Sequence, residues 1–137
     1  MKLKYRSLSS PSPFSKKQKL LRPIIPLSLS SNKASIRFEA LIDSGADFCI
    51  FPTSIAEKLG INLTGLKTIY FSSATGDAVK GNISGIYLNV GEGRFKTKIV
   101  FADLPGNIGI LGQYGFFDKF IVKFDLIKKE IEIKPRK

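Results

Sequence analysis

The sequence contains no histidine, no tryptophan and a single cysteine among its 137 residues. Without histidine, the chain cannot form a Ser-His-Asp triad, a Cys-His pair or most of the zinc sites found in proteins. The acidic residues are scattered singly, and no glycine-rich phosphate-binding loop is present. We therefore expect no metal and no cofactor, and hydrolysis would depend on Asp or Glu acting on water.

The one cysteine, Cys49, lies in an apolar run with Phe48, Ile50 and Phe51. We interpret it as a buried core residue rather than a nucleophile, because no histidine is available to act as its base. A single cysteine also excludes an intramolecular disulfide. These features favour a reducing, intracellular setting, and we expect a cytoplasmic protein.

Long hydrophobic runs are missing as well. The nearest candidate, LLRPIIPLSL at residues 20–29, is interrupted by Arg22, Pro23 and Pro26 and is too short to span a bilayer. The first ten residues are basic but lack the continuous apolar stretch of a signal peptide. The sequence thus predicts no membrane anchor.

Acidic residues are absent from the first 38 positions, which hold nine of the 22 Lys and Arg residues. We predict a basic, Ser/Pro/Lys-rich arm at residues 1–19, with a short strand at Lys2–Tyr5 and a loop at residues 8–19, followed by the folded domain at residues 20–137. The arm could contact nucleic acid or an acidic membrane surface, or it could be a solvated terminus. Its only aromatic residues are Tyr5 and Phe14, so we favour the solvated arm and expect nucleic acid to bind no more than weakly.

Short β-like runs separated by turns make up most of the remaining chain. Ile36, Phe38, Ala40 and Ile42 alternate along one of them, as in a half-buried strand. The segment PTSIAEKLG at residues 52–60 predicts one short helix, and residues 113–120 a helical turn or two. Further strands are expected at residues 68–72, 83–90, 94–101, 108–112, 121–125 and 130–134. The pattern indicates a mostly β, single-domain protein that forms a closed or partly closed β-barrel with one or two short helices.

The segment ALIDSGA at residues 40–46 ends an apolar strand on an acid. Asp-Ser-Gly is ordinary turn chemistry, so Asp43 on its own could be a turn acid. Alternatively, it is a catalytic carboxylate at the end of a rigid strand. Peptide hydrolysis needs a base for water and an acid for the substrate, and two neighbouring carboxyls that share one proton supply both. Only one Asp-Ser-Gly occurs here, so the second carboxylate would have to come from a second copy of the chain.

These residues resemble retropepsin-like aspartic proteases. ALIDSGA resembles the active-site signature of that family, and GILG at residues 109–112 resembles its second signature. Between them, SSATGDAVKG at residues 72–81 lies where the family places its flap, a hairpin that closes over bound peptide. The resemblance covers about residues 23–134 and implies the single-domain acid-protease barrel.

By this resemblance, Asp43 is the catalytic aspartate. Ser44 stands where the family more often has Thr, and it supplies the hydroxyl that bonds across the two-fold axis. Gly45 turns the backbone and directs its N–H to the carboxylate, while Ala46 and Asp47 line the substrate cleft.

The flap would contribute Thr75, Gly76 and Asp77 to substrate binding, although the residues alone identify Asp47 and Asp77 only as solvated turn acids. Ile110, Leu111 and Gly112 would pack beneath the catalytic loop.

Two functions are compatible with this sequence. The first is a homodimeric aspartic endopeptidase that cleaves peptides or proteins through a water activated by the two Asp43 carboxylates, one from each subunit. The alternative is a non-catalytic dimer of the same fold that binds an extended peptide or an acidic partner. The intact Asp-Ser-Gly-Ala segment favours the protease.

Overall fold

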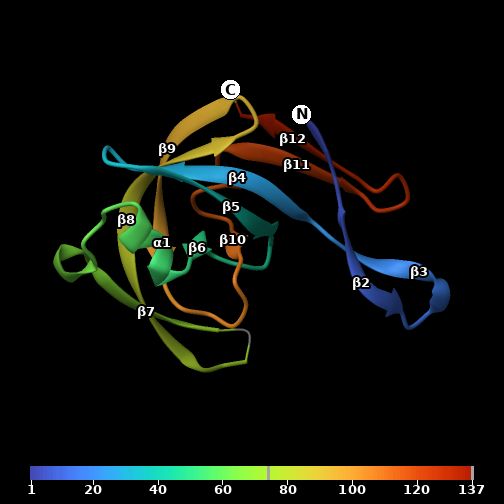
Figure 1. Ribbon diagram of the computed structural model, residues 1–137, viewed down its shortest axis with the longest axis horizontal. Coiled ribbons are helices and arrows are strands. Elements are labelled where there is room, and N and C mark those ends of the chain that lie inside the picture. The colour runs from blue at the N-terminus through green and yellow to red at the C-terminus, as the bar shows by residue number, and fades with distance from the viewer. Residues whose placement is uncertain (74, 137) are drawn as a thin grey trace.

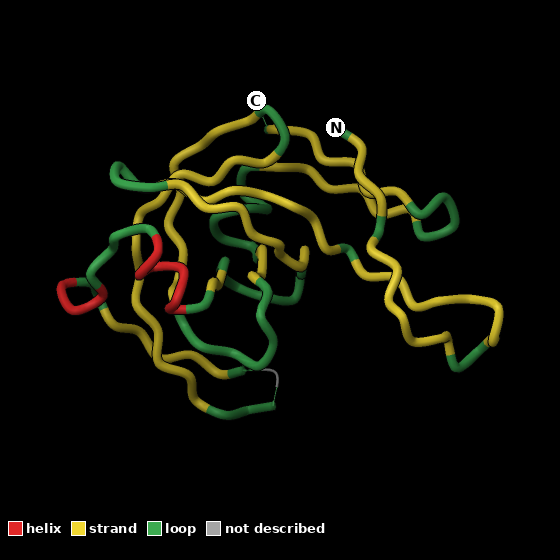
Figure 2. Tube along the Cα trace, viewed as in Figure 1, coloured by secondary structure: helices red, strands yellow, loops and turns green. Residues whose placement is uncertain are grey.

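The computed structural model describes residues 1–73 and 75–136 of the chain, which is mostly β (Figure 1). In the tube view, loops and turns join the strands, and helix is confined to an α-helix at Thr53–Lys58 and a 3₁₀-helix at Leu63–Gly65 (Figure 2). The strands and the helix, in chain order, are β1 Lys2–Lys4, β2 Arg6–Ser12, β3 Ser15–Arg22, β4 Ile24–Ser30, β5 Ser35–Ile42, β6 Ile50–Phe51, α1 Thr53–Lys58, β7 Thr68–Ser72, β8 Ala78–Val90, β9 Gly93–Phe101, β10 Gly109–Leu111, β11 Phe120–Asp125 and β12 Glu130–Pro135.

Six of the strands close into a barrel, which confirms the fold predicted from the sequence. Their order is β4-β5-β10-β6-β9-β8, and β8 pairs again with β4 to complete the ring. Strand β7 extends this sheet beyond β8, and the β7–β8 hairpin stands out from the barrel. The second pairing joins Ser28–Ser30 of β4 to β8 and closes the sheet on itself.

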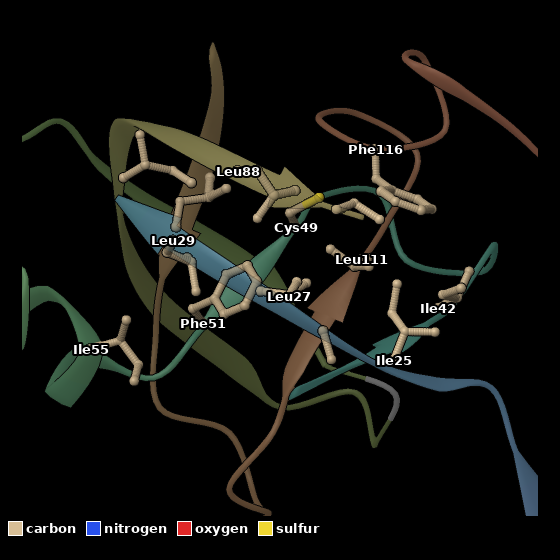
Figure 3. Close-up of a cluster of buried hydrophobic side chains, with 14 of the residues drawn as sticks. Ile25, Leu27, Leu29, Ile42, Cys49, Phe51, Ile55, Leu88, Leu111 and Phe116 are labelled. Atoms are coloured by element: carbon tan, nitrogen blue, oxygen red, sulfur yellow. The ribbon is translucent and has the colours of Figure 1, made fainter. Parts of the chain in front are cut away.

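The interior of the barrel is filled by aliphatic and aromatic side chains from every barrel strand and from α1 (Figure 3). Phe51, Phe101 and Phe116 are fully buried, and so is Cys49. The alternation predicted for residues 36–42 is present, because Ala40 and Ile42 are buried. The core therefore follows from the period-2 pattern of the sequence.

Strand β10 is the element that joins the two sequence signatures. It runs parallel to β5, with Ile110 opposite Leu41 and Leu111 opposite Ile42, and antiparallel to β6 on its other side. Gly109 is required here because a Cβ at this position would lie 2.3 Å from the Phe51 ring. The ends of β5 and β10 consequently lie side by side, although about 70 residues separate them in the sequence.

A second sheet of three strands, in the order β1-β12-β11, is formed by the two ends of the chain. The strand predicted at Lys2–Tyr5 is present as β1, with Leu3 opposite Ile131. Leu3 and Tyr5 pack against the main core, and the Ile133 N–H donates to the Met1 carbonyl at 2.8 Å. The beginning of the basic arm is thus part of the packed structure.

The loop predicted for residues 8–19 is wrong, because β2 and β3 form a hairpin that projects from the barrel (Figures 1 and 2). Serine and proline are typical of loops, but here Pro11 lies at irregularities of the pairing, where a missing N–H is tolerated. Within the described residues, β2 and β3 pair only with each other. The helical turn or two predicted for residues 113–120 is wrong, because residues 113–119 form non-helical turns and Phe120 begins β11. Gly115, with a φ of +104°, interrupts any helix there. Among the residues that the structure describes, no helix has the length and apolar character needed to cross a membrane.

Candidate active site

Asp43 lies directly after β5, in a tight turn. Its N–H donates to the Leu111 carbonyl at 2.9 Å, and its own carbonyl accepts from the Ala46 N–H at 3.1 Å. The first bond ties the turn to the end of β10, and the second closes it. The backbone of Asp43 is therefore fixed by both sequence signatures at once.

The carboxylate of Asp43 is held by the glycine that follows. Oδ1 accepts from the Gly45 N–H at 2.9 Å, and a Cβ on Gly45 would lie 3.2 Å from that oxygen. Asp43 is half-buried, whereas Ser44 and Asp47 are exposed. In the part of the chain that the structure describes, the Ser44 hydroxyl makes no hydrogen bond, so it remains available to a group outside this chain.

The predicted catalytic loop, residues 43–47, packs closely against Gly112 and Gln113. A Cβ on Gly112 would lie 2.3 Å from the Phe48 carbonyl oxygen and 2.7 Å from that of Ala46, so any side chain there would displace the loop. The Gln113 N–H donates to the Ala46 carbonyl at 2.8 Å, and its side-chain Nε2 donates to the Ser44 carbonyl. The packing role predicted for the GILG segment matches these contacts. Sequence reasoning did not identify Gln113, whose only signal was its place directly after that segment.

The predicted flap residues lie in the turn between β7 and β8. The Gly76 N–H donates to the Ser73 carbonyl at 2.9 Å, and Gly76 has a φ of +87°, which favours glycine. The Thr75 hydroxyl lies 2.8 Å from that of Ser73 and 3.3 Å from Oδ2 of Asp77. Thr75, Gly76 and Asp77 are all exposed. The predicted flap residues and the predicted residues at 43–47 thus lie on separate elements. Among the described residues, no hydrogen bond joins the flap turn to residues 43–47.

An apolar surface connects the flap hairpin with the segment that follows the catalytic loop. The rings of Phe48 and Phe71 meet edge to face, with centroids 6.3 Å apart. Both side chains are only partly buried, and they belong to a cluster centred on Ile50, Val100 and Ala102. Other partly buried members of this cluster are Ile69, Val79, Ile83, Leu104 and Ile110. Sequence reasoning missed this surface, because its members come from five separate segments.

Cys49 is chemically quiet in this structure. Burial raises the pKa of its thiol from 9.0 to about 11, so almost no thiolate forms near neutral pH. The interpretation of Cys49 as a core residue is thus confirmed. In residues 1–73 and 75–136, no group of three or more His, Cys, Asp or Glu side chains is arranged to hold a metal ion.

Among the hollows on the surface of the described residues are two of different size, and neither is lined by Asp43. The larger, about 910 Å³, lies between the β8–β9 turn and the terminal strands and includes none of the predicted site residues. The smaller, about 350 Å³, adjoins the catalytic loop and is lined by Asp47, Gln113, Tyr114, Phe117 and Asp118. The larger hollow is thus separate from the predicted catalytic loop, and the smaller one adjoins it.

The sequence model of the aspartyl protease family matches residues 27–114, a range that includes Asp43, the flap turn and β10. The chain belongs to the aspartyl protease family. Its mostly β barrel with a short helix matches the retropepsin fold.

Solved structures show the same fold. EIAV protease, in complex with the inhibitor HBY-793, is 21% identical, with a TM-score of 0.54 over 67% of this chain and 82% of that chain. A retropepsin-like aspartic protease from Rickettsia conorii is 24% identical, with a TM-score of 0.56 over 79% of this chain and 78% of that one. No curated protein matches this aspartyl protease.

Proposed function

We propose that this aspartyl protease is a homodimeric endopeptidase that hydrolyses peptide bonds with two Asp43 carboxylates, one from each protomer. The observation that carries the proposal is the Asp43 turn, which holds a single half-buried carboxylate directly after β5. The chain has only one Asp-Ser-Gly segment. A two-fold axis beside Asp43 supplies the second carboxylate.

In this dimer the two carboxyls share one proton, because ionising both at such short range is unfavourable. The ionised one takes a proton from a water molecule, which attacks the carbonyl carbon of the peptide bond. The protonated one donates to the carbonyl oxygen. In the resulting tetrahedral species, the nitrogen gains a proton and the C–N bond breaks. One product then ends in a new carboxyl group, and the other begins with a new amino group.

The other predicted residues act around this pair. Gly45 orients the carboxylate through its N–H, and the Ser44 hydroxyl bonds to the partner's loop across the axis. The peptide lies extended between the loop and the flap, contacted by Ala46, Asp47 and the turn at Thr75–Asp77. The apolar surface around Phe48 and Phe71 favours large apolar side chains next to the cleaved bond.

We also propose that the enzyme works in a reducing compartment such as the cytoplasm. The support is its single cysteine, which is buried and has no partner for a disulfide.

The proposal is tested by incubating the purified chain with a library of decapeptides between pH 3 and 8, with and without a statine-type peptide, which mimics the tetrahedral species. We expect cleavage at internal bonds between apolar residues, abolished by the statine peptide. Peptide binding without cleavage at every pH would contradict the proposal and support the non-catalytic alternative.

A further inference from the structure

The β2–β3 hairpin carries a concentrated positive charge and an exposed aromatic tip. Phe14 is 93% exposed, although large apolar side chains are costly to leave in water. Lys16, Lys17 and Lys19 follow it on β3 and are exposed. In the described part of the chain, none of these lysines forms an ion pair. The hairpin tip is therefore an unpartnered surface with one aromatic ring and several cations.

The base of this hairpin lies next to β5, the strand that precedes Asp43. The Pro23 carbonyl, directly after β3, accepts from the Ile42 N–H at 2.9 Å, and Ile42 precedes Asp43. Arg6, at the start of β2, forms an ion pair with Glu39 of β5. The hairpin projects from the side of the barrel at which β5 ends (Figure 1). If the proposed two-fold axis passes beside Asp43, the hairpin starts close to that axis and extends toward the partner.

The hollow of about 350 Å³ beside the catalytic loop is lined by carboxylates and aromatic rings, which complement the lysines and the Phe14 ring of the hairpin. Two of its five residues are carboxylates, Asp47 and Asp118, and two are aromatic, Tyr114 and Phe117. Tyr114 is 67% exposed. Asp118 is held in place because its Oδ1 accepts from the Gly115 N–H at 3.0 Å. An aromatic side chain with two lysines a few residues further along the same hairpin matches both the rings and the charges of this hollow.

We infer that the hairpin of each protomer crosses the dimer axis and docks its Phe14 tip in the partner's hollow at Asp47, Gln113, Tyr114, Phe117 and Asp118. The inference rests on the proposed dimer. A hairpin with strands of seven and eight residues reaches about 25 Å, which is enough to cross an axis near its base. By symmetry, the two hairpins clasp both subunits. Docking removes Phe14 from water and places Lys16 and Lys17 near Asp47 and Asp118.

A nucleic acid is the other polyanion that this hairpin could contact. Single-stranded nucleic acid binding relies on several stacking aromatics, and Phe14 is the only aromatic residue between Arg6 and Arg22. The second copy of the chain, in contrast, offers both a ring pair and two carboxylates at a short distance from the axis. The hairpin is thus better suited to the partner protomer.

Disulfide trapping between variants that each carry one introduced cysteine tests this inference, since the native Cys49 is buried and unreactive near neutral pH. Phe14→Cys and Tyr114→Cys proteins are mixed, allowed to exchange subunits and oxidised with diamide at pH 7.5. We expect a covalent dimer of the two variants on a non-reducing gel. Ile127→Cys replaces Tyr114→Cys in the matched control, because Ile127 is 91% exposed and lies in the β11–β12 turn. We expect at least a tenfold weaker cross-link with it.

Equal cross-linking of Phe14→Cys to both partners would overturn the inference, and so would no cross-link at all. Light scattering and peptide cleavage of the same samples separate the two proposals. A catalytic dimer that does not cross-link contradicts only the docked hairpin, whereas a monomer without activity contradicts the proposed function as well. Nucleic acid binding would be the role of the hairpin instead if the wild-type chain bound a labelled oligonucleotide at 150 mM salt and the double variant Lys16→Glu/Lys17→Glu did not.

Discussion

At the scale of single residues, Asp43 is positioned by backbone groups of its neighbours. Leu111 and Ala46 fix its main chain, and Gly45 fixes its carboxylate. The one side-chain bond, from the Gly45 N–H to Oδ1, can also be made to an amide oxygen. We therefore expect that the charge of Asp43 can be removed without moving the loop.

Asp43→Asn should abolish peptide cleavage, with a fall in kcat/KM of at least 1,000-fold, about 4 kcal/mol of transition-state stabilisation. The amide keeps the shape and can still accept from the Gly45 N–H, but it cannot take a proton from water. Circular dichroism and the thermal midpoint should remain close to wild type. Asp125→Asn is the matched control, because Asp125 caps a distant turn through Lys128, and it should retain activity. Normal turnover by the Asp43 variant would place catalysis elsewhere.

Gly112→Ala should destabilise the protein by about 2 to 4 kcal/mol, because the new Cβ would collide with the backbone carbonyls of Phe48 and Ala46. Gly85→Ala is the control, since a Cβ there meets nothing within 4 Å, and its effect should stay within about 0.5 kcal/mol. Urea denaturation measures both variants. Equal stability of the two would show that the loop does not depend on close packing against β10.

Cys49 predicts a pH dependence of stability at high pH. The folded thiol has a pKa of about 11, raised by burial, so the unfolded chain loses this proton first as the pH rises above 9. The contribution is fully present below pH 9 and is lost on approach to pH 11. We expect the free energy of unfolding to fall by about 2 to 3 kcal/mol over this range. Cys49→Ala should remove that part of the slope, as measured by urea denaturation at pH 8, 9, 10 and 11. An unchanged slope would contradict the assignment.

At the scale of elements, the strands and turns that depend on the local sequence pattern were predicted from the sequence. Alternation identified β5, and the Asp-Ser-Gly turn and the apolar run of β10 identified the two halves of the catalytic loop. Gly76 was correctly expected in the flap turn, because a positive φ favours glycine. These features are encoded by neighbours in the chain.

Long-range features could not be predicted in the same way. The bond from Gln113 to the Ser44 carbonyl and the contact of Phe48 with Phe71 join residues that are far apart in sequence. The β2–β3 hairpin was missed because its serines, prolines and lysines lack the apolar alternation of a strand packed on a core. Its strands pair with each other while most of their side chains stay in water.

The two parts of the basic arm should respond differently to deletion. Removing residues 1–5 deletes β1 and uncovers the core beneath Leu3 and Tyr5, so we expect a loss of about 2 to 4 kcal/mol. Replacing residues 7–21 with a short Gly-Ser linker should cost less than about 1 kcal/mol, because Arg6 and Arg22 are already paired neighbours. Urea denaturation of both variants, measured at one protein concentration well above the dimer dissociation constant, distinguishes them. Whether the domain boundary lies at residue 20 stays a prediction until then.

At the scale of the whole molecule, a single chain carries half of the proposed catalytic machinery. Its sequence has one Asp-Ser-Gly segment, and both Ser44 and the predicted flap turn at residues 75–77 are exposed. The terminal sheet is completed within the chain by β1, β12 and β11, so each protomer can fold before it pairs. In the proposed dimer the active site is assembled only on association, so activity should rise with protein concentration as the dimer forms.

The stoichiometry of a statine-type peptide, measured by isothermal titration calorimetry with the protein well above the dimer dissociation constant, tests the shared active site most directly. Two Asp43 carboxylates from two protomers form one site, so the account predicts one peptide bound per two chains. The Asp43→Asn variant should dimerise normally and bind the peptide at least 100-fold more weakly, since it lacks the carboxyl that contacts the statine hydroxyl. One peptide bound per chain would contradict a site shared between two copies of this protease.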